Sequence, residues 1–496
     1  MKASVIDLGF NSVKMVSYDV KKDGSFRSYR QASAKVKLGE GMHKTGQLGK
    51  EPARRTIEAL KLFHDIIGFD SIKHVVPVAT SAVRDADNRD DFLKEVRSQT
   101  GFTFRVLSGT EEAFYSYVGA LQSTCIPTAL FFDIGGGSLE LVYTENFAIK
   151  KVKSYPLGAL RLSQMFDGQS KKSYGRMEEH IMKVLPDKKE LGLSVDTVLV
   201  GVGGALRAVA RYDQDLERYG LDKIHNYRMS LRAVSSIAKE LSGLDPDELA
   251  GVKAVGSNRA DTIVAGSAVI SLLMRKLDFD RVVVSVRGLR EGILSVFARD
   301  RRAYHSGGIN NEKAKAYVTF ACQQEMLPQC TFTLVRPLVA SRLLREKEKA
   351  ILTYAVKEMS DLPQVETASS LFYMVMDEDS VLTHREQLIL ALSLVHSRKE
   401  KAAEWQFARY RSILEPQNMK SVKKVSALLG LSAILEKSKT TARVSIDGER
   451  VTIKLAPARQ LPPALLANAL GNFEKAFGVS VACQVTEKGK DIGVIV

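Results

Sequence analysis

The hydrophobic positions of the first 300 residues alternate between the spacing typical of strands and the spacing typical of helices. Short apolar runs end at small or polar residues, and longer segments repeat their apolar residues every three or four positions. The predicted strands are residues 3–8, 12–18, 25–36 and 75–79, and the predicted helices are residues 51–68, 90–100 and 108–121. This alternation of strands and helices favours an α/β architecture.

The pattern then starts again near residue 128. An apolar strand at residues 129–132 ends in Asp133, and a glycine turn and a second strand follow. The chain opens in the same form, so that VIDLGFNSVKMV matches LFFDIGGGSLELV about 126 residues later. An internal repeat predicts two similar halves that face each other. Two further strand-to-glycine turns follow, at residues 198–204 and 281–292.

Beyond about residue 300 the spacing becomes mainly helical, and the last 56 residues read as a small α+β tail. The predicted helices are residues 311–324, 340–359, 385–396, 420–436 and 463–477, and the predicted strands lie at residues 441–455 and 479–485. We therefore predict four domains: two α/β domains, a helical domain and a small α+β domain. Their expected bounds are residues 1–124, 125–300, 301–440 and 441–496.

Composition agrees with a globular protein, since 45% of the 496 residues are hydrophobic and 26% are charged. The formal net charge is +15, and more than half of it lies in residues 301–496, with 28 basic and 20 acidic residues. This excess indicates a polyanionic partner, although solvated helix faces explain it as well. No base-reading motif accompanies the charge, so we expect no nucleic acid among the partners.

The cysteines and the apolar runs bear on the compartment. The four cysteines lie far apart without a CxxC pair, which argues against a disulfide scaffold or a zinc ribbon and favours a reducing compartment. No apolar run approaches the roughly 18 residues that span a membrane. The opening MKASVIDLG has too short an apolar stretch for a signal peptide, so we expect a cytoplasmic protein without a membrane partner.

The segment Asp133-Ile-Gly-Gly-Gly-Ser138 carries the strongest chemical signal. Three glycines after a strand let backbone N–H groups approach phosphate oxygens without interference from Cβ atoms. A carboxylate at the strand end can hold Mg²⁺, and Glu140 can share the ion. The alternative is a plain β-turn capped by an aspartate. The matching turn after Asp7 favours the functional interpretation and makes Asp7 a third candidate metal ligand.

Other candidates are weaker on spacing alone. Ser108 and Glu111 have the spacing of a capping box, which leaves Glu112 without a local structural role. Glu112 is either a surface glutamate or, if its helix starts at a cleft, a general base for water. Arg84 is either a solvated arginine or a clamp for phosphate. Lys14 is functional only if it faces inward.

Taken together, seven segments resemble the exopolyphosphatase/guanosine pentaphosphate phosphohydrolase family, which lies within the actin-like ATPase-fold superfamily. They are VIDLGFNSVK, VATSAVRDADN, VLSGTEEAF, FFDIGGGSLELV, VGVGGALRAVA, NRADTIVAGSAVI and GLREGIL. These segments run in family order from residue 5 to about residue 294. The region beyond residue 300 resembles the longer members of the family much more loosely.

The resemblance implies two tandem actin-like (RNase H-like) domains that flank a phosphate-binding cleft. It also implies hydrolysis of a terminal phosphoanhydride with Mg²⁺ or another divalent cation. Glu112 matches the catalytic glutamate of the family, and Asp133 and Glu140 match its metal-associated carboxylates. The candidate substrate-binding residues are Asn11, Ser12, Lys14, Arg84, Gly135, Gly136, Gly137, Ser138, Gly203 and Gly204. For Gly203 and Gly204 the alternative is a turn that only allows close packing.

Three positions depart from the family pattern. Phe10 replaces a usual Ser or Thr, Ala205 replaces a usual Thr, and Asp361 lacks the preceding histidine of an HD pair. We therefore interpret the helical domain as a degenerate HD-like domain that holds substrate or forms a homodimer.

The predicted function is removal of terminal phosphate from inorganic polyphosphate. The alternatives are a guanosine pentaphosphate phosphohydrolase, an ATP-using kinase or ATPase of the same superfold, and a non-catalytic polyphosphate or nucleotide sensor. The motifs do not separate the first two substrates, because both present the same terminal anhydride.

Overall fold

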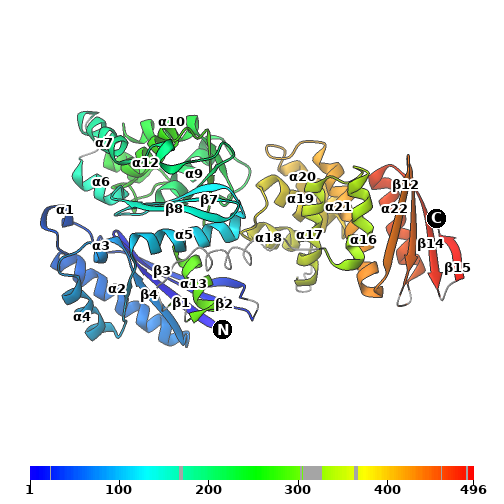
Figure 1. Ribbon diagram of the computed structural model, residues 1–496, viewed down its shortest axis with the longest axis horizontal. Coiled ribbons are helices and arrows are strands. Elements are labelled where there is room, and N and C mark those ends of the chain that lie inside the picture. Colours follow the sequence, from blue (N-terminus) through cyan, green and yellow to red (C-terminus); the bar gives the residue numbers. More distant parts are fainter. Residues whose placement is uncertain are drawn as a thin grey trace. The chain divides into compact units, whose positions relative to one another are not determined.

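The computed structural model describes residues 1–496 apart from residues 23, 167–170, 302–303, 305–326, 362–366, 458, 460, 488–489 and 496. The chain divides into two compact units, Met1–Cys322 and Gln323–Val496 (Figure 1). The first unit contains two mixed sheets with their helices, and the second a helical part and a small sheet. This confirms the predicted α/β class. The bounds of the four domains stay predictions, and the helix predicted at residues 311–324 lies outside the described residues.

The first sheet has the strand order β3-β2-β1-β4-β5. Its central strand β1 is antiparallel to β2 and parallel to β4, and α2 makes the crossover that a parallel neighbour requires. The buried stripe of α2 includes Ile57, Leu60 and Phe63, as the spacing predicts. The strands are β1 (Lys2–Leu8), β2 (Ser12–Val20), β3 (Phe26–Lys35), β4 (His74–Ala79) and β5 (Arg105–Val106). The helices are α1 (Met42–Thr45), α2 (Lys50–Phe69), α3 (Ser81–Arg84), α4 (Arg89–Thr100) and α5 (Gly109–Thr124).

The second sheet has the order β10-β11-β9-β6-β7-β8 and repeats the first. Here β6 is antiparallel to β7 and parallel to β9, as β1 is to β2 and β4, so the internal repeat of the sequence is a repeat of structure. The strands are β6 (Ala129–Ile134), β7 (Leu139–Glu145), β8 (Ala148–Tyr155), β9 (Val198–Gly203), β10 (Arg228–Ser230) and β11 (Arg281–Val284). The helices are α6 (Ala159–Met165), α7 (Lys171–Val184), α8 (Lys188–Leu191), α9 (Gly204–Leu216), α10 (Leu231–Leu241), α11 (Pro246–Gly251), α12 (Ile263–Lys276) and α13 (Leu289–Arg299).

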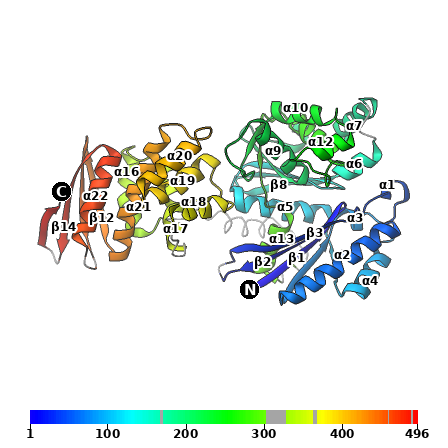
Figure 2. The ribbon, with the colours of Figure 1, turned by 180° about the vertical axis from the view of Figure 1, so that it is seen from behind.

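The two halves of the first unit share one core. Helix α5 lies between the two sheets in both views, and α13 packs against it (Figures 1 and 2). A single cluster of buried side chains joins Val5 of the first sheet, Tyr117 of α5, Phe131 of the second sheet and Ile293 of α13. Burial of this shared apolar surface holds the halves in a fixed relation.

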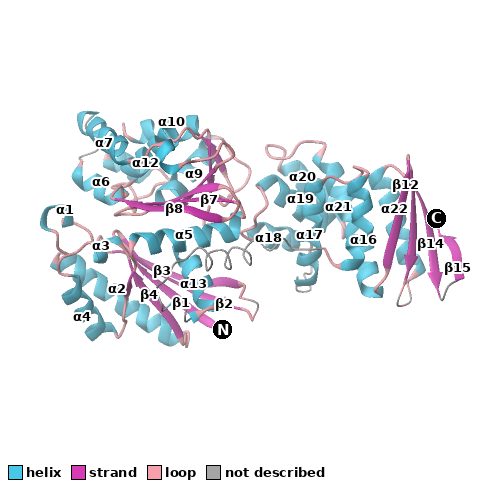
Figure 3. Cartoon of the chain, in the orientation of Figure 1, coloured by secondary structure: helices cyan, strands magenta, loops and turns pink. Residues whose placement is uncertain are grey.

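The second unit combines a helical part with a four-stranded sheet of order β12-β13-β14-β15 (Figure 3). Its sheet alternates buried and exposed residues, and α22 buries Leu466, Leu470 and Phe473 in the same unit. The helices are α16 (Gln329–Ala340), α17 (Glu346–Asp361), α18 (Ala368–Asp377), α19 (His384–His396), α20 (Glu400–Arg409), α21 (Asn418–Ser438) and α22 (Pro463–Phe477). The strands are β12 (Thr441–Asp447), β13 (Arg450–Ala456), β14 (Ser480–Glu487) and β15 (Lys490–Ile495).

The compartment expected from the sequence stays a prediction. Among the helices of the described residues, none combines the length and the apolar character needed to cross a membrane. Cys330 and Cys483 are free thiols.

The contact between α5 and α13 depends on two glycines. A Cβ atom at Gly119 would lie 2.0 Å from the carbonyl oxygen of Gly288, and one at Gly292 would lie 1.8 Å from the carbonyl oxygen of Tyr115. Both obstacles are backbone atoms, which cannot rotate away as a side chain can. We expect Gly292→Ala to separate the helices and destabilise the first unit by at least about 2 kcal/mol, seen as a lower urea midpoint.

Gly68→Ala is the matched control for this prediction. Gly68 also lies in a helix, α2, but a Cβ atom there meets nothing within 4 Å. The same substitution should therefore stabilise the protein by about 0.5–1 kcal/mol, because alanine has the higher helix propensity. Equal urea midpoints for the two variants would contradict the importance of the α5–α13 contact.

Candidate active site

A pocket of about 360 Å³ lies where the two repeated hairpins meet. It brings together most of the residues singled out from the sequence, from both halves of the first unit. The candidates that line it are Asp7, Asn11, Ser12, Lys14, Glu112, Asp133, Gly135, Gly136, Glu140, Gly203 and Gly204. Arg84, Gly137 and Ser138 are not among its lining residues, but each lies next to one in the chain or contacts one. The roles assigned to these residues stay predictions.

The two hairpins present their turns to the pocket in the same register. In the first, Asp7 pairs with Lys14 across β1 and β2, and in the second, Asp133 pairs with Glu140 across β6 and β7. The turns also share a hydrogen bond: Gly9 N donates to Ser12 O (3.1 Å), and Gly135 N donates to Ser138 O (3.0 Å). The halves therefore offer two copies of one turn, with a lysine in one copy where the other has a glutamate.

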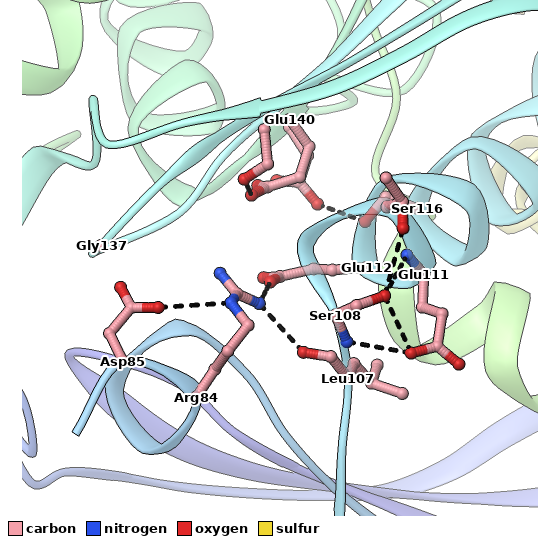
Figure 4. A network of polar contacts seen from close by, with 12 residues as sticks. Arg84, Asp85, Leu107, Ser108, Glu111, Glu112, Ser116, Gly137 and Glu140 are labelled. Carbon is pink, nitrogen blue, oxygen red and sulfur yellow. Dashed lines mark hydrogen bonds and ion pairs between the residues drawn. The ribbon is translucent and has the colours of Figure 1, made fainter. Parts of the chain in front are cut away.

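Glu112 lies in the first turn of α5 and is held by Arg84 from α3. The capping box predicted for this helix is present, since Glu111 N donates to Ser108 Oγ (3.2 Å) and Ser108 N donates to a carboxylate oxygen of Glu111 (2.9 Å). The capping box therefore does not involve Glu112. Arg84 Nη1 donates to Oε2 of Glu112 (2.8 Å) and to the carbonyl oxygen of Leu107 (3.1 Å) (Figure 4).

The environment of Glu112 suits a base that works near neutral pH. The pKa of Glu112 is raised to about 7, because burial and the carboxylates of Asp133 and Asp7 raise it by more than the nearby Arg84 guanidinium lowers it. Glu112 is only 8% exposed. A carboxyl group with a pKa close to the working pH combines a useful ionised fraction with enough basicity to accept a proton.

Two further carboxylates face the same pocket, half-buried Asp133 and buried Glu140, and each accepts a hydrogen bond from a serine. Ser116 Oγ donates to Oδ2 of Asp133 (2.7 Å), and Ser154 Oγ donates to Oε1 of Glu140 (2.8 Å). Burial raises the pKa of both carboxyl groups. Repulsion by Glu112 and Asp133 raises the pKa of Glu140 further, and repulsion by Asp7 raises that of Asp133. The pocket thus confines like charges that an added cation would relieve.

The chemistry of these groups fits a divalent cation of the Mg²⁺ type. Carboxylate oxygens are its preferred protein ligands. In the part of the chain that the structure describes, no three His, Cys, Asp or Glu side chains come close enough to hold an ion between them. One or two of Asp7, Asp133 and Glu140 would therefore hold the cation, with water and phosphate oxygens as its other ligands, an arrangement that is common for Mg²⁺.

Three arginines that the sequence reasoning did not single out also line the pocket, beside Lys14. They are Arg207, Arg259 and Arg290. Burial, together with repulsion by Arg290 and Arg207, lowers the pKa of Lys14 to about 8, and burial lowers the pKa of Arg207 to about 10. Arg207 lies three residues after the strand-to-glycine turn at residues 198–204, and Arg290 lies within the one at residues 281–292. That position was the signal that could have identified them.

Phe10 and Ala205, which depart from the family pattern, both line the pocket as well. The ring of Phe10 is buried and occupies space that only glycines leave open: a Cβ atom at Gly39 would lie 2.1 Å from the ring, and one at Gly137 would lie 2.5 Å from it. Phe10 therefore replaces a hydroxyl group with apolar packing between the two turns.

Comparison with known proteins identifies the family. The model of the Ppx/GppA phosphatase family matches residues 19–298, which are more than half of the chain. This chain belongs to the Ppx/GppA phosphatase family. The resemblance drawn from the seven segments is thereby confirmed.

Three relatives show how far the similarity extends. A bifunctional 3-dehydroquinate synthase/phosphatase of Fusobacterium nucleatum is 30% identical over 308 residues, which cover 56% of this chain and 44% of that protein. Exopolyphosphatase 1 of Mycobacterium tuberculosis is 27% identical and covers 59% of this chain and 87% of that protein. A guanosine-5'-triphosphate,3'-diphosphate pyrophosphatase of Vibrio vulnificus is 27% identical and covers 58% of each. This Ppx/GppA chain thus spans less than half the length of the first relative.

Solved structures of the family have the same architecture. An exopolyphosphatase from Cytophaga hutchinsonii superposes with a TM-score of 0.55 at 25% identity, over 60% of this chain and 98% of that one. The Ppx/GppA family member of Aquifex aeolicus gives 0.52 at 26% identity, over 61% and 99%. These neighbours confirm two tandem actin-like domains in the Ppx/GppA protein.

The crowded carboxylates lead to a prediction about cation binding. Millimolar Mg²⁺ should raise the thermal unfolding midpoint by about 2–4 °C, because an ion that binds only the folded state stabilises it. Asp133→Asn should abolish most of this shift, and Asp65→Asn, at an exposed position on α2, should leave it unchanged. If Asp133→Asn keeps the full Mg²⁺-induced shift, as Asp65→Asn should, Asp133 is not a ligand of the cation.

Proposed function

We propose that this protein hydrolyses the terminal phosphoanhydride of inorganic polyphosphate and releases orthophosphate. The observation that carries the proposal is Glu112, a buried carboxyl group with a pKa of about 7 beside two turns suited to phosphate. Membership of the Ppx/GppA phosphatase family supports it, and so does the likeness to exopolyphosphatase 1 of Mycobacterium tuberculosis.

In this proposal the chain's own residues perform the proton transfer and the positioning. Glu112 accepts a proton from a water molecule as the water oxygen bonds to the terminal phosphorus. The bond from that phosphorus to the bridging oxygen breaks, and the shortened polyphosphate leaves with the electron pair. Arg84 orients Glu112 through its 2.8 Å hydrogen bond. The turn amides and the buried cations of the pocket offset the negative charge of the phosphates.

A divalent cation would complete this charge balance. The residues that would hold it are Asp133, Glu140 and Asp7, because they are the pocket carboxylates of the two repeated hairpins. When bound, the cation would polarise the phosphoryl group and neutralise part of its charge.

A second candidate substrate is guanosine pentaphosphate. It is favoured by the likeness to the guanosine-5'-triphosphate,3'-diphosphate pyrophosphatase of Vibrio vulnificus, whose identity to this chain equals that of the mycobacterial exopolyphosphatase. Both substrates end in the same anhydride, so the pocket described above serves either one. The basic excess of residues 301–496 favours the longer polyanion.

The first test is phosphate release from long-chain polyphosphate, guanosine pentaphosphate and ATP, each with excess Mg²⁺. We expect the highest kcat/KM on polyphosphate and a loss of at least about 100-fold in Glu112→Gln, which cannot accept a proton. Glu111→Gln is the matched control, because glutamine also serves in a capping box. Binding of polyphosphate without phosphate release by the wild type would instead identify a non-catalytic sensor.

The second test uses the pH dependence of kcat/KM at fixed Mg²⁺. Only ionised Glu112 accepts a proton, so the rate should fall about tenfold per pH unit below about pH 7. Arg84 lowers the pKa of Glu112, so Arg84→Met should move this acidic limb to higher pH. Arg89→Met, at an exposed position on α4, should leave the limb in place. An unmoved limb in Arg84→Met would show that another group titrates.

A further inference from the structure

Arg161 of α6 contacts both halves of the first unit, yet neither the motifs nor the lining of the pocket singled it out. Its Nε donates to the carbonyl oxygen of Gly137 (2.8 Å), and its Nη2 donates to Oδ2 of Asp85 (2.7 Å). Its guanidinium carbon lies 5.4 Å from the centre of the Phe10 ring. One side chain thus joins the glycine turn of the second half to the residue that follows α3 in the first half.

The carbonyl groups of the glycine turn all have partners on α6. Ala159 N donates to Gly135 O (3.0 Å), and Leu160 N and Arg161 N donate to Gly136 O (2.9 and 3.0 Å). The third carbonyl, that of Gly137, is bound by the Arg161 side chain instead. Because each peptide unit is planar and trans, a fixed carbonyl also fixes the direction of the next N–H group. Arg161 therefore sets the direction of the Ser138 N–H group.

The other end of Arg161 leads to Glu112. Asp85, which Arg161 binds, also lies 3.4 Å from Nε of Arg84, and Arg84 donates to Glu112 (Figure 4). A continuous series of charge-assisted contacts thus runs from the glycine turn through Arg161, Asp85 and Arg84 to the candidate base. The buried Phe10 ring lies at cation–π distance from the Arg161 guanidinium, which it attracts through the negative face of the ring.

We propose that Arg161 is a positioning residue that aligns the phosphate-holding turn of the second half with Arg84 and Glu112 of the first half. Its kinetic consequences rest on the proposed function. Displacement of a catalytic arrangement by about 1 Å costs as much as 100-fold in rate. Removal of Arg161 frees both the Gly137–Ser138 peptide and Asp85, so it should affect the chemical step more than the binding of substrate.

The test compares Arg161→Ala, Asp85→Ala, the double variant and Arg161→Lys in phosphate release from polyphosphate. Arg161→Ala should lower kcat about 10- to 100-fold and raise KM by only about two- to threefold, because the misdirected turn also binds phosphate slightly less well. The double variant should be about as slow as Arg161→Ala alone, because the two side chains act through one contact. Arg161→Lys should recover part of kcat, since lysine keeps the charge but not the two-armed geometry.

Lys37→Ala is the matched control. Lys37 also joins the two halves, by an ion pair of 2.8 Å between its side chain and Asp261 and with comparable exposure. Its contact with the first turn is made by the backbone N–H group, which donates to Asn11 O (2.9 Å) and is kept in Lys37→Ala. It should keep the wild-type kcat and KM. A kcat in Arg161→Ala equal to that of Lys37→Ala, or a loss confined to KM, would overturn the inference and leave the proposed function standing.

A second measurement does not depend on turnover. The rise in thermal unfolding midpoint caused by tripolyphosphate reports binding at the turn. It should be smaller in Arg161→Ala than in Lys37→Ala, at similar midpoints without ligand. If the wild type releases no phosphate from any substrate but this difference appears, the proposed function fails and the positioning role of Arg161 stands. Equal shifts in both variants overturn the positioning role.

Discussion

The constraint on which the rest of the structure depends is the confinement of opposite charges in one buried pocket. Carboxylates from α5 and from two hairpins share it with two lysines and three arginines. Burial raises the pKa of Glu112 and of Glu140 and lowers that of Lys14, and so favours their neutral forms. Such a set is stable only if each charge is held at a defined distance from its partners, because removing one partner leaves an uncompensated buried charge. The fold supplies that accuracy through rigid strands and short turns.

The glycines explain how the backbone brings so many groups together. Gly119 and Gly292 let α5 and α13 touch, so Glu112 on α5 and Arg290 on α13 reach one pocket. Gly39 and Gly137 make room for the Phe10 ring between the turns. In each case the structure depends on the absence of a Cβ atom at the glycine, which leaves room for a neighbouring helix or ring. This requirement comes from three-dimensional packing and has no counterpart in hydrophobic spacing.

Much of this arrangement could be predicted from the sequence, where local order governs the outcome. The α/β alternation, the repeat, the capping box of Ser108 and the turn after Asp133 all depend on neighbours within a few residues, and the structure contains them. The partners of these groups could not be predicted. Arg207 and Arg290 meet Lys14 only because separate strands end at the same edge, and Arg161 reaches Asp85 across 76 positions of the chain.

The pairing of Asp7 with Lys14 and of Asp133 with Glu140 has a consequence for direction. Two identical halves related by a pseudo-twofold axis would offer a linear ligand two equivalent orientations. The exchange of charge between positions 14 and 140 removes that equivalence and gives the pocket an electrical polarity. A linear ligand with chemically equal ends, such as a polymer of phosphate groups, would therefore take its orientation in the pocket from the charges of the protein and not from a difference between its own ends.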